Sequence, residues 1–258
     1  MERVRFLIKP YLKMDGVIGI YIVGSATRPY RDELSDYDIE VIVEDNVYAR
    51  TPMADRQVFS FKEGAAKVVD YEFYLIPWSD FSKLTESNLD LFHYPYQNAV
   101  LLHDPDGRIE PVICQLADLP ETVRRERMTV HFLELLYRLG RGRKTAQRGS
   151  FLINQALLQG DALSSLTKLI FLVKKSWPAT KHWSEQEFAE LDVPDELLHQ
   201  VKTWISDPTS DHARAMVEAV RDFLDTEGES FQKDMDEIQQ WLFFTPGGKA
   251  AFERWGCR

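Results

Sequence analysis

The residues Val17-Ile18-Gly19-Ile20-Tyr21-Ile22-Val23-Gly24-Ser25 are followed, after ten further residues, by Asp36-Tyr37-Asp38-Ile39-Glu40-Val41-Ile42-Val43. The first run is apolar and β-branched up to its Gly-Ser ending, which is typical of a strand buried on both faces. The second run begins with alternating polar and apolar residues, which is typical of a strand with one solvated face. We therefore expect two strands of one sheet, the first of which ends at Gly24.

The acidic residues of the second run suggest a metal site. Side chains at positions i and i+2 of a strand project from the same face about 6 to 7 Å apart, so Asp36 and Asp38 can present their carboxylates to one metal ion. Mg²⁺ prefers oxygen ligands and commonly takes one or two carboxylates together with substrate phosphates. At Gly24 and Ser25 the backbone N–H groups and the hydroxyl can approach phosphate oxygens. The pattern predicts a site for Mg²⁺ and a triphosphate.

A third carboxylate is expected from the strand predicted over residues 68–76, Val-Val-Asp-Tyr-Glu-Phe-Tyr-Leu-Ile. Asp70 and Glu72 share one parity in this strand, so both are candidates for the same site. The structural alternative is a solvated sheet edge at Asp70 and Glu72 and an ordinary turn at Gly24. The residues alone leave the choice between Asp70 and Glu72 open.

The remaining patterns divide the chain into two parts. An opening helix over residues 3–13 and further strands over 58–61 and 99–103 place a mixed sheet with helices in residues 1–112. After Pro111 the apolar residues take a helical period, which predicts an all-helical domain over residues 113–258. Its expected helices span 121–139 and 151–177, separated by a loop at 140–144, and others begin at Ser184, Pro194 and Ser210. The predicted fold class is α+β.

Composition limits the classes of function. The 258 residues carry 28% charged side chains and a formal net charge of −10, which disfavours nucleic acid or an anionic membrane as the main partner. The two cysteines lie far apart, so no disulfide framework or zinc site is expected. A cytoplasmic protein without a membrane span fits this composition best.

A strand ending in Gly-Ser, a gap of ten residues and an Asp-x-Asp strand resemble the signature of the DNA polymerase beta-like nucleotidyltransferase superfamily. The resemblance covers residues 17–76. The small-molecule branch, which includes the aminoglycoside nucleotidyltransferases, also has an N-terminal nucleotidyltransferase domain followed by a helical domain. Residues 72–80 resemble the strand that carries the catalytic glutamate of streptomycin and spectinomycin adenylyltransferases, which favours Glu72 over Asp70 as the base. Residues 169–183 more weakly resemble an uncharacterised bacterial family of nucleotidyltransferase-like proteins.

The resemblance implies an enzyme that moves a nucleoside monophosphate from an NTP, preferably ATP, to a hydroxyl of a small molecule such as an aminoglycoside. It implies Mg²⁺ held by Asp36, Asp38 and Asp70 or Glu72. The residues it implies for catalysis are Asp36, Asp38 and Glu72, and those for nucleotide binding are Gly24, Ser25, Arg28 and Lys181.

Other interpretations stay open at this stage. Arg28 and Arg31 are equally consistent with solvated loop charges. The other functional class is a non-catalytic nucleotide-binding regulator or antitoxin-type module with the same fold. A homodimer is compatible with the sequence.

Overall fold

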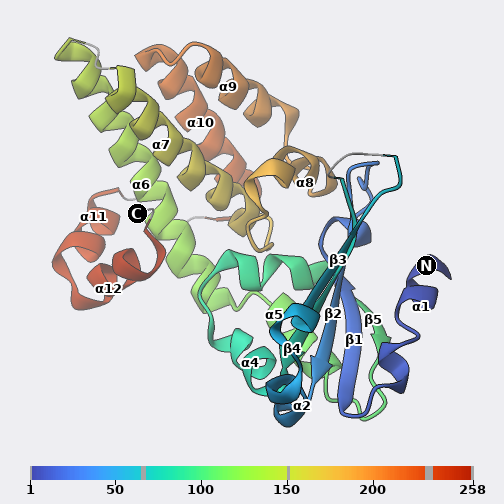
Figure 1. Ribbon diagram of the computed structural model, residues 1–258. Coiled ribbons are helices and arrows are strands. Elements are labelled where there is room, and N and C mark those ends of the chain that lie inside the picture. The colour runs from blue at the N-terminus through green and yellow to red at the C-terminus, as the bar shows by residue number, and fades with distance from the viewer. Residues whose placement is uncertain (1, 65–67, 150–151, 230–234, 257–258) are drawn as a thin grey trace. The chain divides into compact units, whose positions relative to one another are not determined.

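The computed structural model describes residues 2–64, 68–149, 152–229 and 235–256. The chain divides into two compact units, Met1–Asp118 and Leu119–Arg258. The first unit contains the sheet, and the described part of the second unit is helical (Figure 1). This arrangement confirms the predicted α+β fold class.

The first unit is built on a mixed sheet with the strand order β3-β4-β2-β1-β5. Neighbouring strands are antiparallel except for β2 and β4, which are parallel. All five strands lie within two residues of their predicted bounds. They are β1 (Val17–Val23), β2 (Tyr37–Val43), β3 (Gln57–Phe61), β4 (Val69–Pro77) and β5 (Val100–His103).

Helices and turns pack against both faces of the central strands of this sheet, whereas the edge strand β3 is largely exposed. Ile20 and Ile39 belong to a cluster that includes residues of α1 (Glu2–Leu7) and α2 (Asp45–Arg50). Tyr21 and Ile42 belong to a second cluster, with residues of α4 (Trp78–Lys83) and α5 (Glu110–Ala117). Because neighbouring residues of a strand point to opposite faces, β1 contributes to both clusters and is apolar throughout. The short helix α3 (Met53–Arg56) precedes β3.

The division between the units differs from the predicted boundary at residues 112/113. Helix α5 belongs to the first unit, which ends at Asp118. Ile109, just before α5, and Leu116 within it are both fully buried in the cluster around Tyr21. A boundary at 112/113 would cut through this helix and expose its apolar side.

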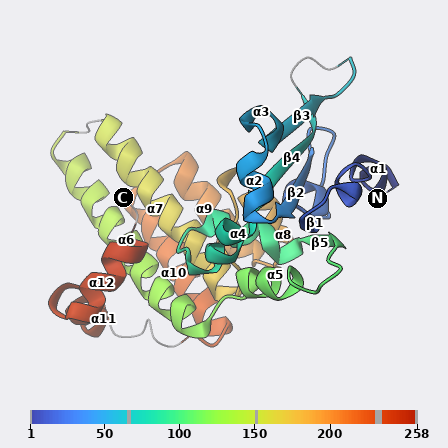
Figure 2. The same cartoon turned by 60° about the horizontal axis from the view of Figure 1, so that its bottom comes forward.

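The second unit consists of seven helices in its described part, and α6 and α7 lie side by side in it (Figure 2). Its main core is formed by residues of α6, α7, α8, α9 and α10, among them Phe132, Leu169 and Met216. A smaller cluster joins α6 to α11 and α12. The helices are α6 (Glu121–Gln147), α7 (Leu152–Val173), α8 (Ser184–Glu190), α9 (Asp195–Ser206), α10 (Ser210–Thr226), α11 (Met235–Phe244) and α12 (Pro246–Trp255).

One sequence-based expectation about these helices was wrong. The predicted loop at 140–144 is helical, because α6 continues through Gly140 and Gly142 to Gln147. Helix α8 begins at Ser184, as predicted, after Trp183 as N-cap and without a side-chain capping bond.

Helix α7 is long and apolar enough to cross a membrane by length and composition alone, and 44% of its most apolar window is buried in the structure. Core helices of soluble proteins pass the same test, so the expected absence of a membrane span stays a prediction.

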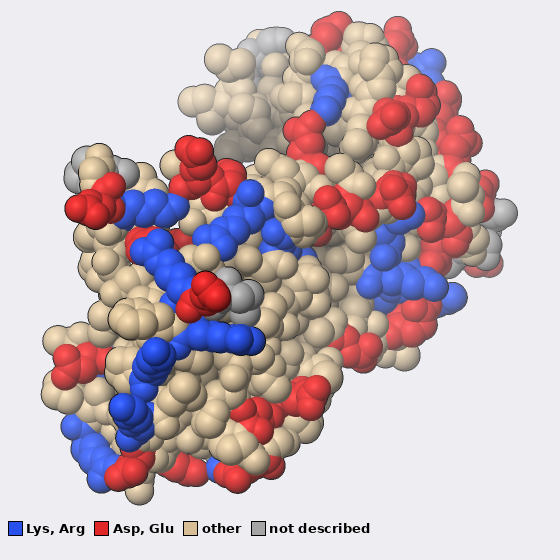
Figure 3. Space-filling view, turned by 90° about the vertical axis from the view of Figure 1, so that its right-hand side faces the viewer, with Lys and Arg blue, Asp and Glu red and all other residues tan. Residues whose placement is uncertain are grey.

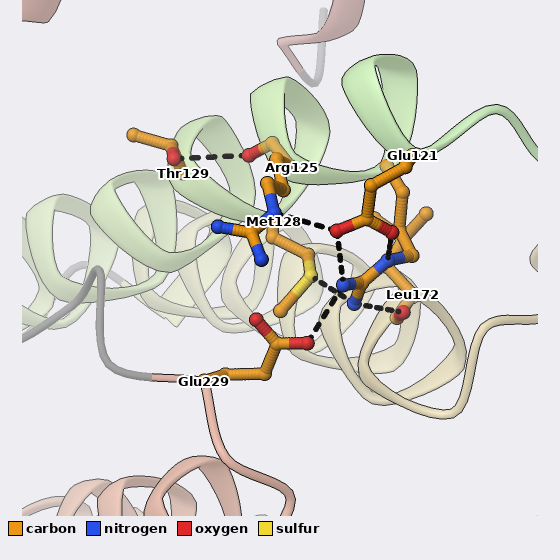
Figure 4. A network of polar contacts seen from close by, with 7 residues as sticks. Glu121, Arg125, Met128, Thr129, Leu172 and Glu229 are labelled. Atoms are coloured by element: carbon orange, nitrogen blue, oxygen red, sulfur yellow. Dashed lines mark hydrogen bonds and ion pairs between the residues drawn. The ribbon is translucent and has the colours of Figure 1, made fainter.

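A buried arginine ties three parts of the second unit together (Figure 4). The Arg124 guanidinium donates two hydrogen bonds to Glu121, of 2.7 and 2.8 Å, and one to the Leu172 carbonyl oxygen at the end of α7. It also forms an ion pair of 2.7 Å with Glu229, which follows α10 and is 6% exposed. The positive charge of Arg124 therefore balances the negative charge of the buried Glu229 carboxylate.

Candidate functional site

The first strand ends in a turn whose shape depends on glycine. Gly24 has a φ of +75°, in the left-handed region that favours glycine. A Cβ atom at this position would collide with Oδ2 of Asp38, which lies on the neighbouring strand. The turn Gly24–Thr27 is closed by a hydrogen bond of 2.8 Å from the Thr27 hydroxyl to the Gly24 carbonyl oxygen. Gly24 therefore lies directly beside Asp38, one of the predicted metal ligands, and Ser25 follows it in the turn.

The predicted carboxylates of two strands come together. Asp36 and Asp38 are two residues apart at the start of β2, and Asp38 is the register partner of Glu72 on the parallel strand β4. Burial and then the charges of Asp36, Glu72 and Glu40 raise the pKa of Asp38 to about 7. Burial and the charge of Asp36 also raise the pKa of Glu72. The side chains are thus near enough to disfavour each other's ionised form.

No basic group of the protein compensates this cluster within the described residues. No lysine, arginine or histidine there forms an ion pair with Asp36, Asp38 or Glu72. Like charges held together at a partly buried position are unfavourable unless a cation joins them. The electrostatics therefore fit a site that takes up a positive ion.

Glu40 is a member of this cluster that the sequence analysis did not single out. Its carboxylate accepts hydrogen bonds from the hydroxyls of Tyr21 and Tyr96, the latter at 3.0 Å. Burial raises its pKa, and these two hydrogen bonds lower it in part. The signal was present as the spacing of Asp36, Asp38 and Glu40, which places a third acid on the same face of β2.

Glu72 is held by its own strand. The hydroxyl of Tyr74, two residues further along β4, donates a hydrogen bond to Oε2 of Glu72. Positions 72 and 74 project from the same face, so this contact fixes the direction of the carboxylate.

Asp70 does not join the cluster, which corrects its assignment as a metal ligand. Its carboxylate forms an ion pair with Arg3 of α1. The register between β3 and β4 shifts at this point, since Ser60 pairs with Tyr71 but Phe61 pairs with Val69. The extra residue in such a bulge interrupts the alternation of faces, so Asp70 and Glu72 no longer share a direction. Of the two candidates, only Glu72 lies at the site.

The predicted nucleotide-binding role of Arg28 also conflicts with its position. Arg28 is 7% exposed, its guanidinium carbon lies 4.2 Å from the centre of the Tyr94 ring, and Nη2 donates a hydrogen bond of 2.9 Å to the Tyr94 carbonyl oxygen. It therefore stabilises the fold around Tyr94. Arg31 is exposed, and its guanidinium carbon lies 4.1 Å from the centre of the ring of Tyr37, the residue that directly follows Asp36. Arg31 is thus the better candidate for a phosphate contact in this loop.

Lys181 belongs to the second unit, where it opens the short turn Lys181–Trp183 with an exposed side chain. The carboxylate cluster is built from the first unit alone. A role of Lys181 in nucleotide binding stays a prediction.

The donor set fits Mg²⁺ that arrives with phosphate better than a permanently bound ion. Among the described residues, no group of three or more histidine, cysteine, aspartate or glutamate side chains is arranged to hold a metal ion. Mg²⁺ needs only one or two carboxylates when phosphates and water complete its shell. Asp36 and Asp38 meet this smaller requirement, and their uncompensated charge would attract the ion.

No family model matches the chain, and no curated protein matches it. Among solved structures, the chain is similar to a nucleotidyltransferase-like protein from Exiguobacterium sibiricum 255-15, with 19% sequence identity and a TM-score of 0.47. The match covers 98% of this chain and 85% of that chain. The resemblance to the aminoglycoside branch stays a prediction.

Proposed function

We propose that this protein is a Mg²⁺-dependent nucleotidyltransferase that moves a nucleoside monophosphate from an NTP to a hydroxyl of a small molecule. The observation that supports this most is the uncompensated cluster of Asp36, Asp38 and Glu72 beside the turn at Gly24. A cluster of like charges with no ligand would destabilise the fold, because no interaction would offset the repulsion. A bound cation would relieve the repulsion, and the phosphates of a nucleotide would complete its coordination shell.

In this proposal Asp36 and Asp38 bind Mg²⁺ together with the phosphates of the donor. The bound ion would supply neutralisation of the phosphate charge that develops as the bond to pyrophosphate breaks. The backbone N–H groups at Gly24 and Ser25, together with the Ser25 hydroxyl, bind phosphate oxygens at the end of β1. The absence of a side chain at Gly24 allows that close approach.

Glu72 acts as the general base. It takes the proton of the acceptor hydroxyl, whose oxygen forms a bond to the α-phosphorus while pyrophosphate leaves with the electrons of the α–β bridging bond. A raised pKa makes a carboxylate a better proton acceptor near neutral pH, and burial and Asp36 raise that of Glu72. The hydrogen bond from Tyr74 orients the carboxylate for this step.

The charge of the first unit suggests the class of acceptor. The first unit, Met1–Asp118, contains 20 acidic and 12 basic residues, which favours a polycationic acceptor such as an aminoglycoside. The face shown in Figure 3 exposes both acidic and basic side chains, and several of the basic ones lie next to one another.

The test is a screen of the four NTPs with Mg²⁺ against aminoglycosides, nucleosides and proteins, with pyrophosphate release as the readout. Glu72→Gln should bind nucleotide like the wild type and lose about 10²- to 10⁴-fold in turnover, the usual contribution of a general base. Asp70→Asn is the matched control, since it changes a carboxylate of the same strand that points elsewhere.

Wild-type turnover in Glu72→Gln would show that Glu72 is not the general base. Nucleotide binding without turnover against every acceptor would favour the regulatory or antitoxin-type class instead.

A further inference from the structure

The second unit contains a cavity of about 670 Å³ that the proposed function does not use. It lies between α6, α7 and α10, and Trp204 of α9 contributes to its wall. Leu139, Ala156 and Val217 give it an apolar lining from three helices. Its size is within the range of sites for small organic ligands, which are about 300 to 1,000 Å³.

Helix α6 contributes two glycines to the wall of this cavity. Gly140 and Gly142 both line it, although glycine inside a helix costs roughly 0.5 to 1 kcal/mol relative to alanine. Neither glycine has a positive φ, and a Cβ atom at either position would have no neighbouring atom within 4 Å. Neither backbone shape nor packing therefore requires glycine here. A ligand that needs space beside the helix would explain the presence of glycine at both positions.

The cavity wall is rich in arginine. Arg138 forms an ion pair of 3.3 Å with Asp161, and Arg214 forms one of 3.6 Å with Asp211. Arg143 and Arg221 also line the cavity, and within the described part of the chain neither has an acidic side chain at ion-pair distance. Both are exposed. Glu218 is the acidic residue of the lining and forms no ion pair with either arginine, so among the described residues two guanidinium groups without an ion-pair partner lie at the edge of the cavity.

We propose that this cavity binds a small amphipathic organic anion, with an apolar body against Leu139, Ala156 and Trp204 and a carboxylate or phosphate group at Arg143 and Arg221. Guanidinium groups match the planar geometry of carboxylate and phosphate oxygens. The apolar lining supplies most of the affinity, and the arginines select the sign of the charge. This site is independent of the carboxylate cluster of the first unit.

Binding can be tested with decanoate as the probe, by calorimetric titration of the full-length protein. Decanol and decylammonium are matched probes with the same apolar chain and no charge or a positive charge. We expect decanoate to bind at one site and at least roughly tenfold more tightly than either of them. No binding of decanoate, or equal affinity for all three probes, would overturn the proposal.

Variants locate the site. The double change Arg143→Gln and Arg221→Gln should weaken decanoate binding about tenfold or more and leave decanol binding unchanged. The control is Arg141→Gln, because Arg141 lies on the same helix between the two glycines but does not line the cavity. A loss in the control equal to that in the double variant would indicate attraction by the general positive charge of α6 and contradict the site.

Gly142→Leu separates binding from folding. A leucine should fill space in the cavity and also raise the helical propensity of α6, so we expect unchanged or higher thermal stability with loss of decanoate binding. Undiminished binding in a folded Gly142→Leu protein would place the ligand elsewhere.

Discussion

Gly24 and Asp38 cannot both keep their positions if residue 24 carries a side chain. The new Cβ atom would collide with Oδ2 of Asp38, and the φ of +75° would be strained as well. Gly24→Ala should therefore destabilise the first unit by roughly 1 to 3 kcal/mol and weaken binding of Mg²⁺ and nucleotide. Urea unfolding and calorimetric titration measure the two effects.

Gly107→Ala is the control for Gly24→Ala. Gly107 also has a positive φ, of +65°, but a Cβ atom there would meet nothing within 4 Å. It should show the cost of the backbone strain without any effect on nucleotide binding. Normal nucleotide binding in Gly24→Ala would contradict the contact between the turn and Asp38.

The sequence predicted part of the candidate site, and the pairing between strands determined which of the other predicted residues lie there. Asp36, Asp38 and Glu72 meet as expected because strand alternation and the pairing of β2 with β4 bring them together. The bulge that turns Asp70 toward Arg3 depends on the pairing of β4 with β3, which one strand's sequence does not reveal. The burial of Arg28 against Tyr94 likewise depends on a segment far away in the chain.

At the scale of single elements, helix α6 continues where its sequence suggests an end. Gly140 is an interior residue of the 27-residue helix, and a Cβ atom there would have open space. Gly140→Ala should therefore stabilise the second unit by roughly 0.5 to 1 kcal/mol, since alanine loses less backbone entropy. Thermal unfolding checks this.

Gly248 in α12 provides the contrasting variant. A Cβ atom there would collide with the backbone at Trp241 and Leu242, so Gly248→Ala should destabilise the same unit. If both alanine variants destabilised the unit, the described path of α6 through Gly140 would be in doubt.

Strands were predicted better than helix ends, for a physical reason. Each strand is a short run of β-branched and aromatic residues that packing and propensity favour together. A glycine in a helix costs only about 1 kcal/mol, which the packing of α6 beside α7 overrides. The short helices α2, α3 and α4 went unpredicted, because one or two turns carry too few residues to show a period.

At the scale of the whole molecule, each unit has its own apolar core, so stability can be examined unit by unit. In the second unit His131 is fully buried. Burial, with smaller contributions from Arg127 and Lys168, lowers its pKa to about 4, although Glu134, whose Oε2 lies 3.6 Å from the ring Nδ1, acts in the opposite direction.

This histidine predicts how the second unit responds to acid. His131 takes up a proton at about pH 6.5 in the unfolded chain and only near pH 4 in the folded unit. The contribution of neutral His131 to the stability of the second unit is therefore complete above pH 6.5 and falls as the pH drops. Between pH 7 and pH 5 we expect a loss on the order of 2 kcal/mol in urea unfolding followed by tryptophan fluorescence. His131→Gln should remove this pH dependence. If the stability of His131→Gln kept the same pH dependence, groups other than His131 would be its cause.

The most direct test of the central claim is calorimetric titration with the α,β-methylene analogue of ATP, with and without Mg²⁺. The wild type and Asp70→Asn should bind the analogue in the presence of Mg²⁺, and Mg²⁺ alone should bind weakly, because the two aspartates complete its shell only with phosphates. Asp36→Asn and Asp38→Asn should each lose roughly 100-fold in affinity while remaining folded. Undiminished binding in both aspartate variants would place the nucleotide elsewhere and contradict the site.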